Sequence, residues 1–172
     1  MTQHTLATLN CQSQVLKSVK LCLNILRDCC TKTNMQTFLP YADFQRSAAC
    51  LDNKRLGKQR IECLQILKAL SDPSYGWQNH PAVRMWVNHS TALGMYATEI
   101  CGEWTRRGFR DTCLEKINAT ICILPNNLRL PSWFGNEAFH ASHRSNLLRK
   151  DFAHYSQFGW SEPSNLPYVW PV

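Results

Sequence analysis

The chain has 172 residues, which suits one domain with a buried core, and 44% of them are hydrophobic. Nineteen Lys and Arg against twelve Asp and Glu give a net charge of +7, which favours an anionic partner such as nucleic acid. Nine cysteines without a C-x-x-C pair argue against a disulfide framework or a zinc site and favour a reducing, intracellular environment. Because no apolar run approaches the length of a membrane span, we expect no membrane partner.

The first 34 residues form a segment of their own. Its apolar residues recur at roughly helical spacing, and polar residues interrupt the apolar core that a signal peptide needs. We therefore interpret residues 1–34 as an appended amphipathic helix or as sequence upstream of the true start. The functional domain is expected over residues 35–172.

Helical periodicity dominates that domain. The spacing of apolar residues predicts a first core helix over about 46–70 and a second over about 81–107. Pro81 suits the first turn of the second helix, and Gly108 suits its C-terminal cap. A third helix is predicted over about 136–155.

Two stretches do not fit this helical pattern. Residues Thr120–Leu124 are predicted to be extended, and the Pro-rich stretch SEPSNLPYVWPV, residues 161–172, is not compatible with regular helix. The predicted fold is therefore mainly α, a single compact domain of about three core helices with an irregular C-terminal tail.

The stretch LDNKRLGKQRIE, residues 51–62, places one carboxylate after four cations. On a helix, Arg55, Lys58, Gln59 and Glu62 fall at i, i+3, i+4 and i+7 and so share one face. Such a face can meet phosphate, and a lone acid on it would be repelled by DNA unless it acted at a cationic or electrophilic centre. The alternative is a Lys58–Glu62 ion pair on a solvated surface.

His140 and His143 have the i, i+3 spacing of metal ligands. No HExxH motif and no Cys/His quartet accompanies them, so structural or phosphate-contacting roles are the favoured interpretation. A metal-dependent nuclease using these histidines remains one alternative. A non-catalytic basic DNA-binding module is the other.

Four stretches, taken in chain order, resemble the pyrimidine dimer DNA glycosylase family, the phage endonuclease V type. They are LD-x3-L-x5-E, GWQNHP, EWTRRGF and HRSNLLRKD. The stretches MQTFLPY, NHPAVRMW and LPYVWP resemble a phage-borne branch of the family. The resemblance covers about residues 35–172. The chain departs from the family pattern at Ile61, where the family has an arginine directly before its glutamate.

The resemblance implies a DNA N-glycosylase with abasic-site lyase activity, which acts on UV-induced pyrimidine dimers through an imine with the N-terminal amine. It places the catalytic glutamate at Glu62 and the nucleophilic amine on Met35 if the chain starts there. No metal or other cofactor is implied. The expected partner is double-stranded DNA containing damaged pyrimidines, bound by a monomer. The residues expected to contact DNA are Arg55, Lys58, Arg60, His80, Arg107, Arg144, Arg149 and Lys150.

Overall fold

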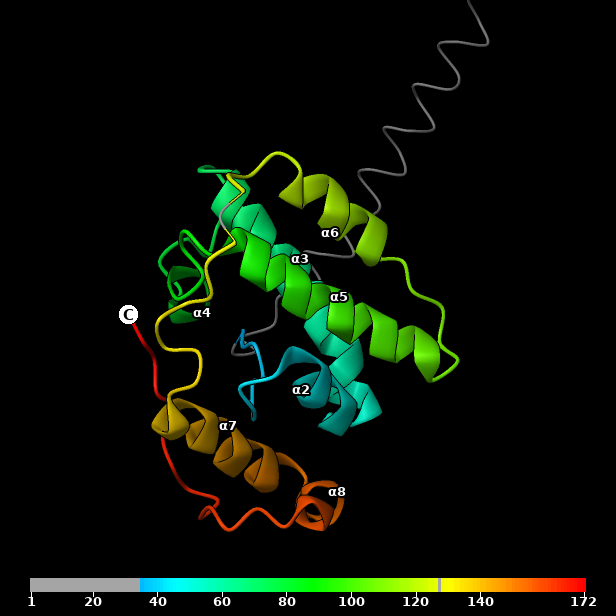
Figure 1. Ribbon diagram of the computed structural model, residues 1–172, viewed down its shortest axis with the longest axis vertical. Coiled ribbons are helices and arrows are strands. Elements are labelled where there is room, and N and C mark those ends of the chain that lie inside the picture. Colours follow the sequence, from blue (N-terminus) through cyan, green and yellow to red (C-terminus); the bar gives the residue numbers. More distant parts are fainter. Residues whose placement is uncertain (1–34, 127) are drawn as a thin grey trace, which may run out of the picture. The chain divides into compact units, whose positions relative to one another are not determined.

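The computed structural model describes residues 35–126 and 128–172 (Figure 1). The amphipathic helix predicted within residues 1–34 lies outside the described residues. The described part of the chain contains helices and no strand, which confirms the mainly α fold class. Its helices are α2 (Phe44–Cys50), α3 (Asn53–Ser71), α4 (Pro81–Arg84), α5 (Ser90–Arg106), α6 (Leu114–Ile121), α7 (Glu137–Lys150) and α8 (Phe152–Tyr155), followed by the 3-10 helix η1 (Ser156–Phe158).

Each of the three long helices predicted from the sequence is divided in two. Asp52 separates α2 from α3, because its carboxylate accepts the backbone N–H of Arg55 at 3.1 Å and caps the new helix. Asp151 does the same between α7 and α8, where it accepts the N–H of His154 at 3.2 Å. Between α4 and α5 the chain turns through Asn88, which has a φ of 64°.

The prediction that Thr120–Leu124 is extended is wrong: α6 runs to Ile121 and a turn follows. The β-branched residues of that stretch favour a strand, but the carboxylate of Asp111 accepts the backbone N–H of Leu114 at 2.8 Å and starts α6 just before it. The helix then packs closely on α5, where a Cβ at Gly94 would lie 2.3 Å from Ile121 Cδ1. Tertiary packing thus overrides the local preference.

The main core lies where α3 and α5 pack against each other, with α2 and α6 beside them (Figure 1). The apolar residues whose spacing predicted the first helix point inward: Leu56, Cys63 and Leu67 are fully buried, and Leu70 is partly buried. Burial of such side chains stabilises a fold by about 1.5–3 kcal/mol each. Among the described residues, no helix has both the length and the apolar character that crossing a membrane requires.

A non-helical segment, residues 35–41, connects this core to α7. Side chains of Gln59 on α3 and Tyr96 on α5 bind its backbone from one direction, and side chains of α7 bind it from the other. The C-terminal tail, residues 161–172, is irregular as predicted and is also held by α7, where Ser142 Oγ accepts the N–H of Val169 at 3.2 Å. Segments from both ends of the described chain therefore meet at α7.

Candidate active site

Glu62 lies on α3 with only 3% of its surface exposed, so it does not belong to a solvated surface. Its Oε2 accepts a hydrogen bond from Gln59 Nε2, and the same nitrogen donates to the carbonyl oxygen of Gln36 at 2.7 Å. Lys58 Nζ lies 3.3 Å from Glu62 Oε1, and this lysine side chain is 44% exposed. The carboxylate is therefore an interior group with a charged partner on its solvent side.

Burial raises the pKa of Glu62 from 4.5 to about 7, because the interior disfavours its charged form. The positive charge and hydrogen bond of Lys58, the Gln36 N–H and the charge of Lys150 oppose this rise. A carboxyl group with a pKa near neutrality exchanges its proton readily at physiological pH. Glu62 is thus chemically suited to acid–base work or to stabilising a cation.

Residues 35 and 36 are packed against this carboxylate. Met35 is 4% exposed and Gln36 is 3% exposed. Since Gln59 Nε2 binds both the Gln36 carbonyl oxygen and Glu62 Oε2, and successive Cα atoms are about 3.8 Å apart, the backbone of Met35 lies near the carboxylate. The buried glutamate and the start of the segment 35–41 form one site.

Two histidines of α7 fasten the same segment further along. His140 Nδ1 lies 2.8 Å from the carbonyl oxygen of Leu39, and His143 Nδ1 accepts the Leu39 N–H at 3.4 Å. Burial lowers the pKa of His143 to about 3, so its ring is neutral, as an acceptor must be. Both histidines, whose spacing is that of metal ligands, contact the backbone of Leu39 instead. In the part of the chain that the structure describes, no cluster of three or more His, Cys, Asp or Glu side chains is suited to hold a metal ion.

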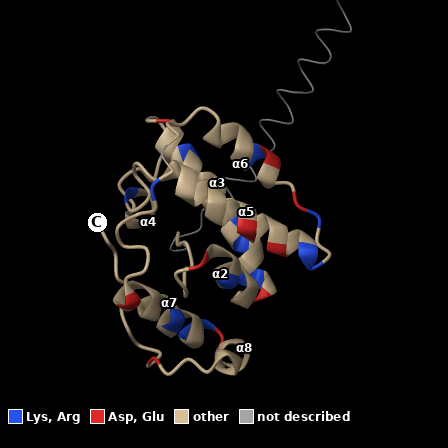
Figure 2. Cartoon of the chain, in the orientation of Figure 1, with Lys and Arg blue, Asp and Glu red and all other residues tan. Residues whose placement is uncertain are grey.

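Three exposed cations, Lys58, Arg149 and Lys150, surround the site; we call them the basic rim. Burial and the charges of Arg55, Arg149 and Lys58 lower the pKa of Lys150, while Glu62 opposes the shift. Lys58 and Lys150 therefore lie within electrostatic reach of Glu62, and Arg149 lies within reach of Lys150. In Figure 2 the ribbon of α7 is blue at basic positions toward its C-terminal end.

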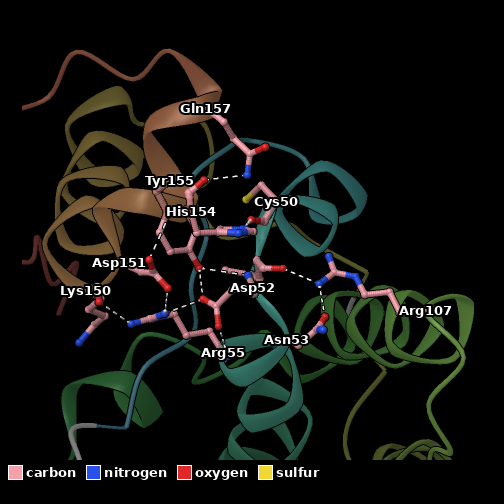
Figure 3. A network of polar contacts seen from close by, with 11 residues as sticks. Cys50, Asp52, Asn53, Arg55, Arg107, Lys150, Asp151, His154, Tyr155 and Gln157 are labelled. Carbon is pink, nitrogen blue, oxygen red and sulfur yellow. Dashed lines mark hydrogen bonds and ion pairs between the residues drawn. The ribbon is translucent and has the colours of Figure 1, made fainter.

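Arg55 ties the beginning of α3 to the end of α7 (Figure 3). Its guanidinium lies 2.6 Å from Asp52 Oδ2 and donates to the carbonyl oxygen of Lys150 at 3.0 Å. Tyr155 donates its hydroxyl proton to the same Asp52 oxygen at 2.6 Å. Because the Arg55 side chain is only 15% exposed, its observed contacts hold Lys150 in place beside the site.

Residues 35–116 match the family model described as pyrimidine dimer DNA glycosylase. Over these residues the chain belongs to the pyrimidine dimer DNA glycosylase family. The matched part contains Glu62, the segment 35–41 and all of α3, so the buried carboxylate and the backbone beside it lie within the glycosylase match. Comparison with curated proteins and with solved structures gave no match.

Membership of the glycosylase family supports a role in DNA repair, but several basic residues predicted to contact DNA have other partners in this structure. Arg60 pairs with Asp111 at 2.6 Å and stacks over Trp104, and its side chain is 12% exposed. Arg107 pairs with Glu103 at 2.6 Å. It also donates to the carbonyl oxygens of residues 49 and 51 and, at 2.9 Å, to Asn53 Oδ1, the last of which Figure 3 shows. DNA contacts by Arg60 and Arg107 stay predictions.

Arg144 is the most buried of the predicted DNA contacts, with 8% of its surface exposed. It pairs with Glu137 and, at 2.6 Å, with Glu162, and it donates to the carbonyl oxygen of Pro40 at 2.8 Å. Its observed role is to secure the end of the segment 35–41. A phosphate contact by Arg144 also stays a prediction.

His80, which the resemblance placed before the long helix, caps α4. Its Nδ1 accepts the backbone N–H of Ala82 at 3.1 Å. The ring centroid lies 5.5 Å from that of Trp77 and 6.1 Å from that of Trp170, which joins this loop to the C-terminal tail. Burial lowers the pKa of His80, which favours its neutral form.

Sequence reasoning missed three residues that complete the site. Gln59 was placed on the right helical face but was given no role, and neither Gln36 nor Tyr168 was predicted to lie at the site. The Tyr168 hydroxyl hydrogen bonds to the Gln36 side chain, and its ring packs 5.5 Å from that of His143. The helical register was a usable signal for Gln59, but contacts of the tail with Gln36 depend on the fold.

Proposed function

We propose that this protein is a DNA N-glycosylase with abasic-site lyase activity that removes UV-induced pyrimidine dimers, and that Glu62 and the α-amine of Met35 are its catalytic groups. The observation that carries the proposal is that Gln59 Nε2 donates both to the Gln36 carbonyl oxygen, at 2.7 Å, and to the buried Glu62 carboxylate. In a protein that begins at Met35, this arrangement puts a primary amine near the acid.

An α-amine is a good nucleophile near neutral pH. Its ordinary pKa of about 7.7–8.0 lies well below the value of about 10.4 for lysine, so the fraction unprotonated at pH 7 is larger by roughly two- to four-hundredfold. The amine nitrogen bonds to the anomeric carbon of the damaged nucleotide while the glycosidic bond breaks and the base leaves with the bonding electrons. Loss of the amine proton and opening of the sugar ring then give the iminium ion.

Glu62 acts on the charge that develops in these steps. Its carboxylate stabilises the sugar cation and the iminium ion, and it assists the proton abstraction that cleaves the strand. Because the group is 3% exposed, its charge acts through a medium of lower dielectric constant than water. A carboxylate at this position therefore contributes most when positive charge forms beside it.

The basic rim supplies the binding surface for the DNA backbone. Lys58 and Lys150 are exposed and lie near the acid, with the exposed Arg149 beside Lys150, so phosphates on either side of the damaged nucleotide have cations within reach. Crosslinked pyrimidines stack poorly and deform easily, which lowers the cost of exposing the sugar at the lesion. Duplex DNA with damaged pyrimidines is thus the substrate that we propose.

Borohydride reduction tests this function. A protein that begins at Met35 is incubated with UV-irradiated duplex, with duplex containing an abasic site, and with undamaged duplex, each with and without a chelator. We expect a covalent adduct with the first two and none with the third, unaffected by the chelator. Binding without an adduct would indicate a non-catalytic module, and chelator-sensitive cleavage without an adduct would indicate a metal-dependent nuclease.

A further inference from the structure

We propose that Gln59 is a positioning residue of this site, whose side-chain amide fixes the Glu62 carboxylate relative to the segment that begins at Met35. The inference rests on the proposed function and adds a residue to it. Gln59 touches neither the sugar nor the base in this proposal; it acts through the two groups that do the chemistry.

Both ends of the Gln59 amide form hydrogen bonds. Its Nε2 donates to the Gln36 carbonyl oxygen at 2.7 Å and to Glu62 Oε2. Its Oε1 accepts the Phe38 N–H at 3.0 Å and lies 2.9 Å from the Tyr96 hydroxyl oxygen. The side chain is fully buried, so water does not compete for these bonds.

The position in the chain explains why one residue can serve both partners. Gln59 precedes Glu62 by three residues, and so the two side chains lie on the same face of α3. The segment 35–41 runs over that face, and Gln59 binds it at Gln36 and again at Phe38. The amide therefore links helix to segment at the level of the carboxylate.

Only a primary amide of this length matches the pattern of partners. Two acceptors face the nitrogen, and a backbone donor and a hydroxyl face the oxygen. A glutamate at this position would set an oxygen against Gln36 O and Glu62, and an asparagine would be one methylene too short. A methionine would fill the volume and form none of the bonds.

The contact also orients the carboxylate. Gln59 binds Oε2, which leaves Oε1 facing Lys58 Nζ at 3.3 Å on the exposed side of the site. A hydrogen bond donated to a carboxylate also favours its ionised form. Loss of the amide is therefore expected to affect both where the charge lies and the pH at which it forms.

The test compares Gln59→Met with the parent protein, both beginning at Met35. Single-turnover base release and borohydride trapping are measured from pH 5.5 to 8.5, together with the affinity for irradiated duplex. We expect the rate to fall at least about tenfold, since misplacement of a reacting group by about 1 Å can cost a hundredfold. The acidic limb of the pH profile is expected to move to higher pH, with affinity unchanged within about twofold.

Two variants separate positioning from general loss of stability. Leu67→Ala removes a fully buried side chain two turns further along α3, so it should lower the melting temperature but leave the acidic limb where it is. Tyr96→Phe removes one partner of the Gln59 oxygen and should shift the limb in the same direction by a smaller amount. If Gln59→Met does not fold, as judged by circular dichroism, the comparison of Tyr96→Phe with Leu67→Ala decides.

The outcomes are distinguishable. An active parent protein with a slower Gln59→Met and a shifted limb supports the inference. An active parent whose Gln59→Met or Tyr96→Phe variant keeps the parental rate and pH profile overturns the inference and leaves the proposed function standing. A parent that neither releases base nor forms an adduct overturns both.

Discussion

His143 accepts a hydrogen bond from the backbone N–H of Leu39, a residue 104 positions earlier in the chain. The contact joins α7, which lies beyond the matched glycosylase region, to the segment that adjoins Glu62. Arg144 strengthens the same connection through the carbonyl oxygen of Pro40. The arrangement of the site therefore depends on helices inside and outside the family match.

Glu62→Gln should retain DNA binding and lose most base release and strand cleavage. The substitution removes a negative charge that matters only as positive charge develops, and it leaves the basic rim in place. Single-turnover rates and equilibrium affinity for irradiated duplex measure the two effects separately. An unchanged rate would remove Glu62 from the mechanism.

The same substitution should make the protein more stable at pH 8. The pKa of Glu62 is raised from 4.5 to about 7 in the folded protein, so the folded state binds more protons than the unfolded state between these values. The free energy of unfolding therefore falls as the pH rises through this window. Glu62→Gln escapes this loss, and denaturant unfolding should show a gain on the order of 1–3 kcal/mol at pH 8 that shrinks toward pH 4.5. A surface ion pair would instead give a loss of a few tenths of a kcal/mol.

His143 should make the fold sensitive to acid. Its pKa falls from 6.5 to about 3 on folding, so the unfolded state binds an additional proton between these values and stability declines as the pH drops through them. One such group contributes a slope of about 1.4 kcal/mol per pH unit. His143→Asn keeps an acceptor and cannot titrate, so its stability should fall less steeply from pH 6 to 4. Equal slopes in the two proteins would contradict the assignment.

Lys150 should contact a phosphate, while Lys116 on α6 serves as a matched exposed lysine. Lys150→Ala should weaken binding to irradiated and undamaged duplex alike and lower the slope of log K against log salt concentration by about one unit. Lys116→Ala should leave that slope unchanged. Titrations at several salt concentrations measure both; equal slopes for all three proteins would place Lys150 off the interface.

The sequence predicts the helices of this fold better than their ends. Apolar spacing placed Leu56, Cys63 and Leu67 in the core because helical periodicity is a local property. The breaks at Asp52 and Asp151 arise from single carboxylates that cap new helices, which periodicity alone does not reveal.

The candidate site was only partly predictable. Helical register brought Gln59 and Glu62 to one face, but the burial of that face comes from the segment 35–41, which is held by residues up to 104 positions away. The local sequence pattern could not predict the partners of the arginines for the same reason. Arg60, for example, pairs with Asp111, which lies 51 residues later in the chain, in the connection between α5 and α6.

Mapping the trapped adduct tests the central claim most directly. A protein beginning at Met35 is reduced with borohydride on irradiated duplex, digested with trypsin and nuclease, and sequenced by mass spectrometry. The α-amine mechanism predicts that the sugar remnant lies on the amine of Met35, in the peptide MQTFLPYADFQR. A remnant on the side chain of Lys58 or Lys150 would contradict it, because both lysines lie beside Glu62 and would then supply the nucleophile.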